Sequence, residues 1–390
     1  MNDTTDATAG TGAAGGTAVH GTVAPGYEPV RDVFAAVLAA EEDHAAQFTA
    51  LVDGRPVADL WGGPGIGPDS LVGVFSSTKG IGFLAAALLI QDGAIDPDRA
   101  VAAYWPEFGA EGKDGVTVRD LLGHRAGAIG TEDGFSVAEL ADDRVIAERV
   151  APHAPYWRPG AAFGYHSATI GALTGELVRR VSGAPLKEFY EERIRRPYAV
   201  DLHLGPSAAD EARVLDVLPP RRAGDPERAV APDSLLGIAS NSQHPESMPL
   251  HEAPNNPLFR AGGQASFGGV GSARGLAGLY AAAADLLTPA TQRAVALAHS
   301  AGHDIVLDMT RAYGLGFMVG LPYLGAGAFG HDGAGGSMAL LDPRSGLALG
   351  YVRRRFPADD PGRVPDAERL ARAVRACRLA LTGARLPAQR

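Results

Sequence analysis

The sequence has one cysteine and three lysines among its 390 residues, and it has no hydrophobic run long enough to span a membrane. A single cysteine excludes a disulfide within the chain, and Cys377 falls on the apolar face of an expected C-terminal helix, so we predict that it is buried. The apolar run Ile81 to Ile90 is far shorter than a membrane-crossing helix requires. These absences favour a soluble, cytoplasmic protein without a membrane partner.

An excess of basic charge is absent as well. The formal net charge is −10 and no basic stripe stands out, so we expect no nucleic-acid partner. Hydrophobic residues make up 46% of the chain and charged residues 21%, which is ordinary for a globular enzyme. The first residues carry neither the basic nor the apolar region of a signal peptide, and we expect a disordered leader over residues 1–24.

The stretch Phe75-Ser-Ser-Thr-Lys-Gly80 carries the first chemical signal. The apolar run that follows it ends at Asp92-Gly93 and predicts one buried helix, with Ser76 and Lys79 on one face of its first turn. A lysine amine whose pKa is lowered by burial can remove the proton of a serine hydroxyl, and the free N–H groups of a helix start can stabilise an oxyanion. The alternative is a helix cap followed by a surface lysine. The apolar helix and the scarcity of lysine argue against that alternative.

The remaining pattern predicts strands near both ends of the chain, with helices between them. The predicted helices are Pro29–Glu41, Thr117–Leu122, 136–150, Ser167–Ser182, Ala273–Leu287 and Pro365–Leu381. The predicted strands are Ala46–Val52 and Arg55–Leu60, joined at Asp53-Gly54, and Tyr313–Val319, Ala328–Gly330, Ser337–Leu341 and Leu347–Val352. Residues 203–262 show little periodicity and predict a long irregular excursion. The simplest architecture is one sheet assembled from both ends of the chain around a helical insertion.

Two further motifs contain residue types that could take part in catalysis. Tyr165 follows a Pro-Gly break and precedes a predicted helix, so its phenol could point into a cleft; the alternative is an aromatic side chain that packs against that helix. Ser300, in Ala298-His-Ser-Ala-Gly302, nearly matches a nucleophile elbow. The elbow requires a strand before the serine, and here a helix-like run precedes it, so we do not favour Ser300.

Several motifs occur together in an order that resembles the serine β-lactamase and penicillin-binding-protein superfamily. They are Ser76-x-x-Lys79, Tyr104-Trp-Pro-Glu-Phe108, His124-Arg-Ala-Gly127, Trp157-x-Pro-Gly160, Gly164-Tyr-His-Ser167 and His331-Asp-Gly333. These motifs are most similar to those of the esterase branch, the family VIII carboxylesterases that are similar to class C β-lactamases. The resemblance covers roughly residues 25 to 380.

The resemblance implies a β-lactamase-like α/β fold, with an antiparallel sheet flanked by helices plus an all-helical insertion domain. Residues 25–70 and 263–390 would form the mixed domain and residues 71–262 the helical one, with the active site between them. Ser76 would be the nucleophile, Lys79 its base and Tyr165 the remaining member of a proton relay. The N–H groups of Ser76 and Ala334 would form the oxyanion hole. Substrate-binding positions would be Trp157, His166, His331 and Gly333.

Two departures from the superfamily bear on the substrate. Ser167 stands where β-lactamases usually have asparagine, and His331-Asp332-Gly333 stands where they have Lys-Thr-Gly. A histidine that is largely neutral at pH 7 holds an anion less well than lysine does. We therefore predict a serine esterase that acts on a small-molecule ester or acyl compound and needs no metal or organic cofactor. The alternatives are an acyltransferase of the same fold, a β-lactamase or D-peptidase, and a non-catalytic binding relative. The oligomeric state stays open.

Overall fold

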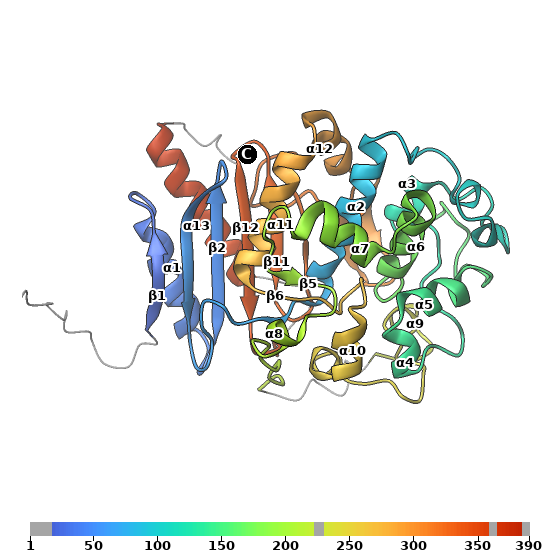
Figure 1. Ribbon diagram of the computed structural model, residues 1–390, viewed down its shortest axis with the longest axis horizontal. Helices are drawn as coiled ribbons and strands as arrows, with labels where there is room; N and C mark the ends of the chain where they lie inside the picture. The colour runs from blue at the N-terminus through green and yellow to red at the C-terminus, as the bar shows by residue number, and fades with distance from the viewer. Residues whose placement is uncertain (1–17, 222–229, 359–364, 384–390) are drawn as a thin grey trace, which may run out of the picture.

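A nine-stranded antiparallel sheet forms one side of the molecule (Figure 1). The structure is a computed structural model that describes residues 18–221, 230–358 and 365–383. The strand order is β1-β3-β2-β12-β11-β10-β9-β8-β7. The bounds are Val19–Val23 (β1), Ala46–Val52 (β2), Arg55–Gly62 (β3), Ser300–Asp304 (β7), Met309–Tyr313 (β8), Met318–Val319 (β9), Phe329–Asp332 (β10), Met338–Asp342 (β11) and Leu347–Arg353 (β12).

The sheet joins the two ends of the sequence, as predicted. β2 pairs with β12 from Ala46↔Arg353 to Val52↔Leu347. The predicted hairpin between β2 and β3 turns at Asp53 and Gly54, which have φ values of +50° and +74°. Two positive φ values are the backbone of a two-residue type I′ turn, so the Asp-Gly signal was correct.

Both faces of the central strands are covered by helices. Alternate residues of β11 and β12 pack into one core with α1 (Glu28–Ala39) and α13 (Pro365–Thr382), and that core includes the buried Cys377. The intervening residues face α11 (Ala273–Leu286), which packs on β2, β11 and β12. A Cβ on Gly350 would lie 2.1 Å from the carbonyl oxygen of Ala273, so glycine permits this close approach of helix to strand.

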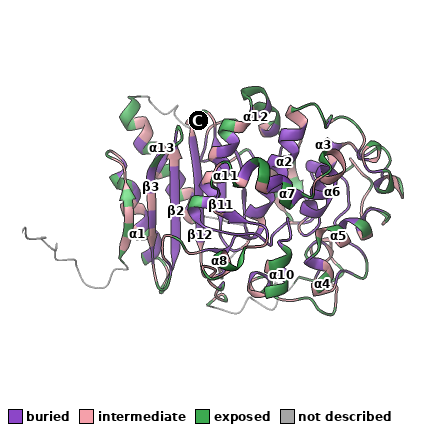
Figure 2. Cartoon of the chain, viewed as in Figure 1, coloured by how far each residue is buried: buried purple, intermediate pink, exposed green. Residues whose placement is uncertain are grey.

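Most of the helices between β4 and β6 form the other side of the molecule (Figure 1). Their bounds are Lys79–Gln91 (α2), Val118–Leu122 (α3), Val137–Leu140 (α4), Asp143–Val150 (α5), Ile170–Ser182 (α6), Leu186–Tyr190 (α7), Ala208–Glu211 (α8), Leu235–Ala239 (α9) and Pro257–Gly262 (α10), and α12 (Pro289–Ala296) follows α11. A small sheet of β4 (Val72–Gly73), β6 (Val270–Gly271) and β5 (Leu202–His203) lies between the two sides. α2 is buried from Lys79 to Leu89, as the apolar run predicted, and Figure 2 shows buried residues throughout the central strands.

The predicted disordered leader was wrong in its last residues. β1 pairs with β3 from Val19↔Gly62 to Val23↔Ala58, inside the predicted range 1–24. The strand has just two apolar residues, so backbone pairing with β3 orders it, and local hydrophobicity does not predict that pairing. Residues 1–17 lie outside the described part of the chain.

Residues 136–150 form two helices where one was predicted. The carboxylate of Asp142 accepts hydrogen bonds from the N–H groups of Arg144 and Val145, and it thereby starts α5 after α4 has ended. The Asp142 cap is a local signal for a break between two helices. The prediction of one helix followed the apolar periodicity, which continues across this break.

The C-terminal strands also differ from the prediction. The strand predicted over Tyr313–Val319 is two strands, β8 and β9, because the chain turns between them at Gly316, where φ is +87°. β7 was not predicted at all. The described part of the predicted irregular excursion over 203–262 contains three short α-helices, α8, α9 and α10, and a 3₁₀ helix over Ala253–Asn255, and residues 222–229 lie outside the described part. Among the described helices, none has both the length and the apolar character needed to cross a membrane.

Candidate active site

Ser76 lies in a short 3₁₀ helix, η1 (Phe75–Thr78), between β4 and α2. It is partly exposed while the residues on both sides of it are buried. Phe75 has φ of +49°, a conformation that costs free energy for a bulky residue and is found where a functional side chain must be aimed. The Thr78 hydroxyl donates to the Phe75 carbonyl at 2.5 Å and stabilises this backbone. The sequence predicted that Ser76 lies in a regular first turn of the helix, whereas in the structure it lies in a 3₁₀ turn that precedes α2.

Strand β10 and the turn after it lie against η1. The Ser77 hydroxyl donates to the carbonyl of His331 at 3.2 Å, and the Ser337 hydroxyl donates to the carbonyl of Val74 at 2.6 Å. A Cβ on Gly333 would lie 2.6 Å from the Val74 carbonyl oxygen, so the close contact requires glycine. The predicted motifs at Ser76 and at His331, which are more than 250 residues apart, are therefore neighbours.

Lys79 begins α2 and is 1% exposed. Its Nζ lies 3.0 Å from the Ser76 Oγ and donates to the Ser266 carbonyl at 2.8 Å. Burial holds the pKa of Lys79 well below its usual range, and the nearby Asp332 carboxylate opposes that shift. A neutral amine in this position can accept the serine proton through its lone pair while it keeps its bond to Ser266.

Tyr165 lies in the loop before α6, as predicted, and its ring is 4.8 Å from the Lys79 Nζ. The ring also stacks on Tyr313, with centroids 6.1 Å apart and planes at 10°. Burial raises the pKa of Tyr165 above its usual value, and the nearby Ser76 side chain opposes that rise. The Tyr165 hydroxyl is buried and has no hydrogen-bond partner among the described residues. The phenol is therefore protonated at neutral pH, and a phenolate in the resting site is disfavoured.

His331 and Asp332 end β10 beside these groups. His331 Nδ1 lies 2.7 Å from the Asp332 carbonyl oxygen, so it carries the ring proton and donates, which leaves Nε2 as an acceptor. Burial and the nearby Lys79 lower the pKa of His331 to about 3, so the ring is neutral. Asp332 accepts a hydrogen bond from Arg311 Nη1 at 3.1 Å. Arg311 was not identified from the sequence, because the strand predicted there starts at Tyr313 and does not include it.

The predicted second oxyanion donor, Ala334, lies in the turn between β10 and β11. The Gly333 N–H donates to the Ser337 carbonyl at 2.9 Å, and the Gly336 N–H donates to the Gly333 carbonyl at 2.8 Å. Ala334 is half-buried and packs against the cluster that contains Phe75. The Ser76 N–H belongs to the first turn of η1, where helix N–H groups have no partner within the helix.

Two predicted substrate-binding residues, His166 and Trp157, contact each other. His166 is fully buried; its Nδ1 bonds to the Gly164 carbonyl at 2.7 Å, and its Nε2 accepts from the Ala128 N–H at 3.1 Å. Burial lowers the pKa of His166 to about 4. With both ring nitrogens used, this geometry favours a structural role for His166 over substrate binding. Trp157 is half-buried and contacts the His166 ring edge to face, with centroids 5.6 Å apart.

Asp304, at the end of β7, is a site residue that the sequence did not reveal. One carboxylate oxygen accepts from the N–H groups of Tyr165 (3.1 Å), Val306 and Leu307 (both 3.0 Å), and the other accepts from the Tyr313 hydroxyl at 3.1 Å. The side chain thus positions both the backbone of Tyr165 and the ring that stacks on it. No local signal identifies this role, because β7 was itself unpredicted.

Replacing Asp304 by alanine is expected to lower the free energy of unfolding by about 3 kcal/mol, since four buried donors lose their acceptor. Turnover should fall by at least about tenfold because Tyr165 loses its support. Urea unfolding and ester kinetics measure the two effects. Asp308→Asn, at an exposed position in the same loop, is the control and should change neither. Unchanged kinetics in a stably folded Asp304→Ala variant would exclude the positioning role.

Other candidate sites in the described residues have structural explanations. The Ser300 hydroxyl is buried and donates to the Gly123 carbonyl at 2.6 Å, so the elbow-like motif does not present a free nucleophile. Potential metal ligands of Asp201, His203 and Asp210 lie within 4.8 Å of one another. Arg213 pairs with Asp201 at 2.7 Å and with Asp210 at 3.2 Å, so a guanidinium already supplies the positive charge there.

A partly exposed serine beside a desolvated lysine and a buried tyrosine provides the groups that serine acyl-transfer chemistry requires. The family described as Beta-lactamase matches residues 30–373. The chain belongs to this Beta-lactamase family.

Three relatives show how close the similarity is. The esterase/beta-lactamase LipL of Mycobacterium tuberculosis is 32% identical over 366 residues, which cover 87% of this chain and 84% of that protein. The structure of EstA from Arthrobacter nitroguajacolicus Rue61a is 39% identical with a TM-score of 0.86, covering 92% of this chain and 98% of that one. A family VIII carboxylesterase structure is 29% identical with a TM-score of 0.83, and the match covers 92% of this chain and 100% of that one. The predicted family and fold class are confirmed.

Proposed function

We propose that this protein hydrolyses carboxylic esters through an acyl-enzyme formed on Ser76. The observation that carries the proposal is the 3.0 Å distance between the Ser76 Oγ and the Nζ of a lysine that is 1% exposed. A lysine on the protein surface would be protonated and could not act as a base at neutral pH. A relative of 32% identity named as an esterase/beta-lactamase and a family VIII carboxylesterase structure of 29% identity support the same class, and the chain is a carboxylesterase-type hydrolase.

Acylation begins when the Ser76 hydroxyl oxygen attacks the ester carbonyl carbon and Lys79 takes the hydroxyl proton. The carbonyl oxygen becomes an oxyanion, which the N–H groups of Ser76 and Ala334 would stabilise. Two fixed donors of this kind contribute several kcal/mol to lowering a barrier. The bond to the alkoxy oxygen then breaks, and Tyr165, which is protonated at rest, donates a proton to the leaving alcohol and recovers one from Lys79.

Deacylation repeats these steps with water as the nucleophile. Tyr165 accepts a proton from water as it passes its own proton to Lys79, and the water oxygen attacks the acyl carbon. The bond between the acyl carbon and the Ser76 oxygen then breaks, and Lys79 returns a proton to that oxygen as the acid leaves. The chemistry uses no metal or organic cofactor. An alcohol or amine in place of water would give acyl transfer instead, and it would use the same residues.

The motif His331-Asp-Gly333 bears on substrate class. The pKa of His331 is lowered to about 3, so this residue brings no positive charge to the site at neutral pH. Arg311 is engaged by Asp332 at 3.1 Å. Among the described residues of the site, His331 is neutral and Arg311 is paired with Asp332, which favours an acyl group that has no carboxylate, whereas β-lactams and peptide C-termini carry one.

The proposal is tested by comparing nitrophenyl butyrate with the nitrophenyl ester of succinate and with a chromogenic cephalosporin. We expect kcat/KM for the neutral ester to exceed the other two by at least about tenfold. Adding methanol or a primary amine separates hydrolysis from transfer, because a transferase would release the acyl group mainly as a new ester or amide. A preference for the cephalosporin would contradict the esterase proposal.

A further inference from the structure

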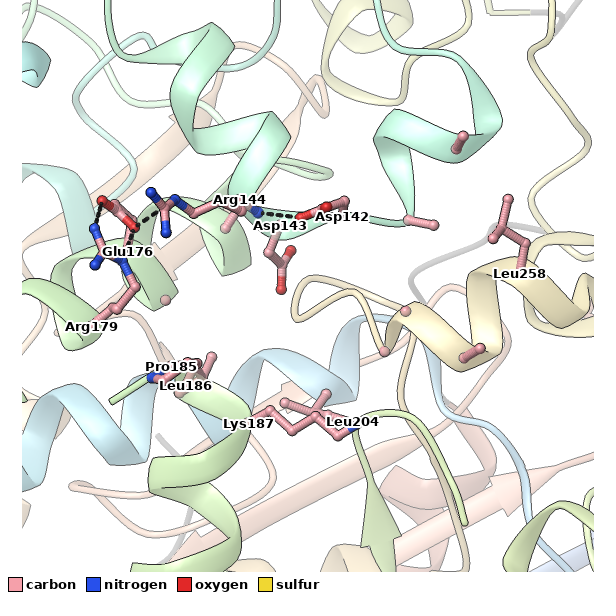
Figure 3. A pocket seen from close by; sticks show the side chains of 17 residues that line it. Asp142, Asp143, Arg144, Glu176, Arg179, Pro185, Leu186, Lys187, Leu204 and Leu258 are labelled. Atoms are coloured by element: carbon pink, nitrogen blue, oxygen red, sulfur yellow. Dashed lines mark hydrogen bonds and ion pairs between the residues drawn. The ribbon is translucent and has the colours of Figure 1, made fainter. Parts of the chain in front are cut away.

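A cavity of about 490 Å³ lies among α4, α5, α6, α7 and α10 (Figure 3). Its described walls are mainly small or aliphatic side chains, including Ala138, Ala141, Ala172, Leu186, Leu204 and Leu258. Ser76, Lys79 and Tyr165 are not among the described residues that line it. The volume falls within the range of about 300–1,000 Å³ that is common for small-molecule sites.

One carboxylate in this cavity has an unused acceptor. Asp143, the first residue of α5, accepts a hydrogen bond from the Ala265 N–H through Oδ2 at 2.9 Å. Its Oδ1 is shielded from solvent and has no hydrogen-bond partner among the described residues, although the residue as a whole is only half-buried. Figure 3 shows this carboxylate directed into the cavity. A shielded acceptor without a donor costs free energy, and burial raises the pKa of Asp143 to about 7.

The other charges at the cavity leave Asp143 as the candidate anchor. Glu176 is covered by Arg179 and Arg180, each at 2.7 Å, and Arg144 pairs with Glu148 at 2.9 Å. Asp142 lies at the exposed start of α5, where it caps the helix. Lys187 lines the opposite wall (Figure 3), so positive charge is disfavoured at that end and favoured beside Asp143.

We propose that this cavity binds a small organic amine, with its ammonium group donating to Asp143 Oδ1 and its apolar body against the alanine and leucine side chains. A charged N–H donor satisfies a carboxylate oxygen more strongly than a neutral hydroxyl does, and an organic anion at this position would be repelled by the Asp143 carboxylate. The proposal concerns a site separate from Ser76 and does not rest on ester hydrolysis.

The binding test uses benzylamine as the probe, titrated by calorimetry against the full chain, with benzyl alcohol and benzoate as neutral and anionic comparisons. Asp143→Asn removes the charge while its amide oxygen can still accept from Ala265. Asp142→Asn is the matched control, because it removes the same charge from the adjacent residue and asparagine also caps a helix well. We expect saturable benzylamine binding that weakens at least about tenfold in Asp143→Asn and less than about twofold in Asp142→Asn.

A second variant keeps the proposal testable if Asp143→Asn fails to fold. Ala138 is exposed on α4 and lines the cavity, so Ala138→Phe fills part of the space without disturbing a buried contact. We expect it to abolish benzylamine binding. Absence of saturable binding, equal loss in the two aspartate variants, equal binding of benzoate, or full binding to Ala138→Phe would each overturn the proposal.

Discussion

Ser76→Ala is expected to lower kcat/KM for nitrophenyl butyrate by about 10⁴-fold or more, because the variant has no atom on which to form the acyl-enzyme. The fold should be retained, since Ser76 is partly exposed and its hydroxyl lies against the Lys79 amine and does not fill a core position. The free energy of unfolding, measured by thermal unfolding, should change by no more than about 0.5 kcal/mol, as it does for a surface substitution. Mass measurement after treatment with a fluorophosphonate probe should show an adduct on Ser76 in the native protein and none in the variant.

The matched control is Ser300→Ala, at the other serine in a nucleophile-like motif. The buried Ser300 hydroxyl donates to the Gly123 carbonyl, so its loss should reduce stability by about 1–3 kcal/mol and leave probe labelling intact. Labelling that persists in Ser76→Ala, or that moves to Ser300, would refute Ser76 as the nucleophile.

The second large effect is expected at Lys79. Lys79→Arg should be nearly as inactive as Lys79→Ala, each with kcat lowered by about 10²–10⁴-fold. A guanidinium keeps the positive charge but does not release its proton at any accessible pH, so it cannot serve as the base for Ser76. Lys113→Arg is the control: Lys113 is also fully buried, but it donates to the carbonyls of Ala110 and His153. That variant should retain turnover wherever it folds.

The pH profile provides an independent readout of the same base. Lys79 acts only when neutral, so kcat/KM should fall as the pH falls through its pKa. Burial lowers that pKa well below 10.5, and the fall should therefore lie below that value. Tyr165→Phe should slow acylation strongly while it preserves the ring stacking on Tyr313. Near-normal turnover in Lys79→Arg would make Lys79 an electrostatic support and not the base.

Local sequence determined much of the framework. The Asp53-Gly54 hairpin, the buried helix after Ser76 and the C-terminal helix with Cys377 on its buried face were all predictable. Each depends on turn chemistry or apolar periodicity within about twenty residues, and such signals act before distant contacts form. The motifs around Ser76, Tyr165 and His331 were also visible, because reactive side chains can be recognised by residue type and spacing.

Tertiary structure alone decided which residues contact the motifs and which protonation states their side chains have. β1 and β7 are strands because β3 and β8 pair with them, and their own residues carry little hydrophobic signal. Asp304 reaches Tyr165 across 139 residues, and the cavity at Asp143 requires five helices from separate segments. The lowered pKa of Lys79 comes mainly from desolvation by the packed chain around it. Burial and long-range pairing depend on the complete fold. The sequence could therefore name the residue types that we propose to be catalytic, while their protonation states arise only when the distant segments pack together.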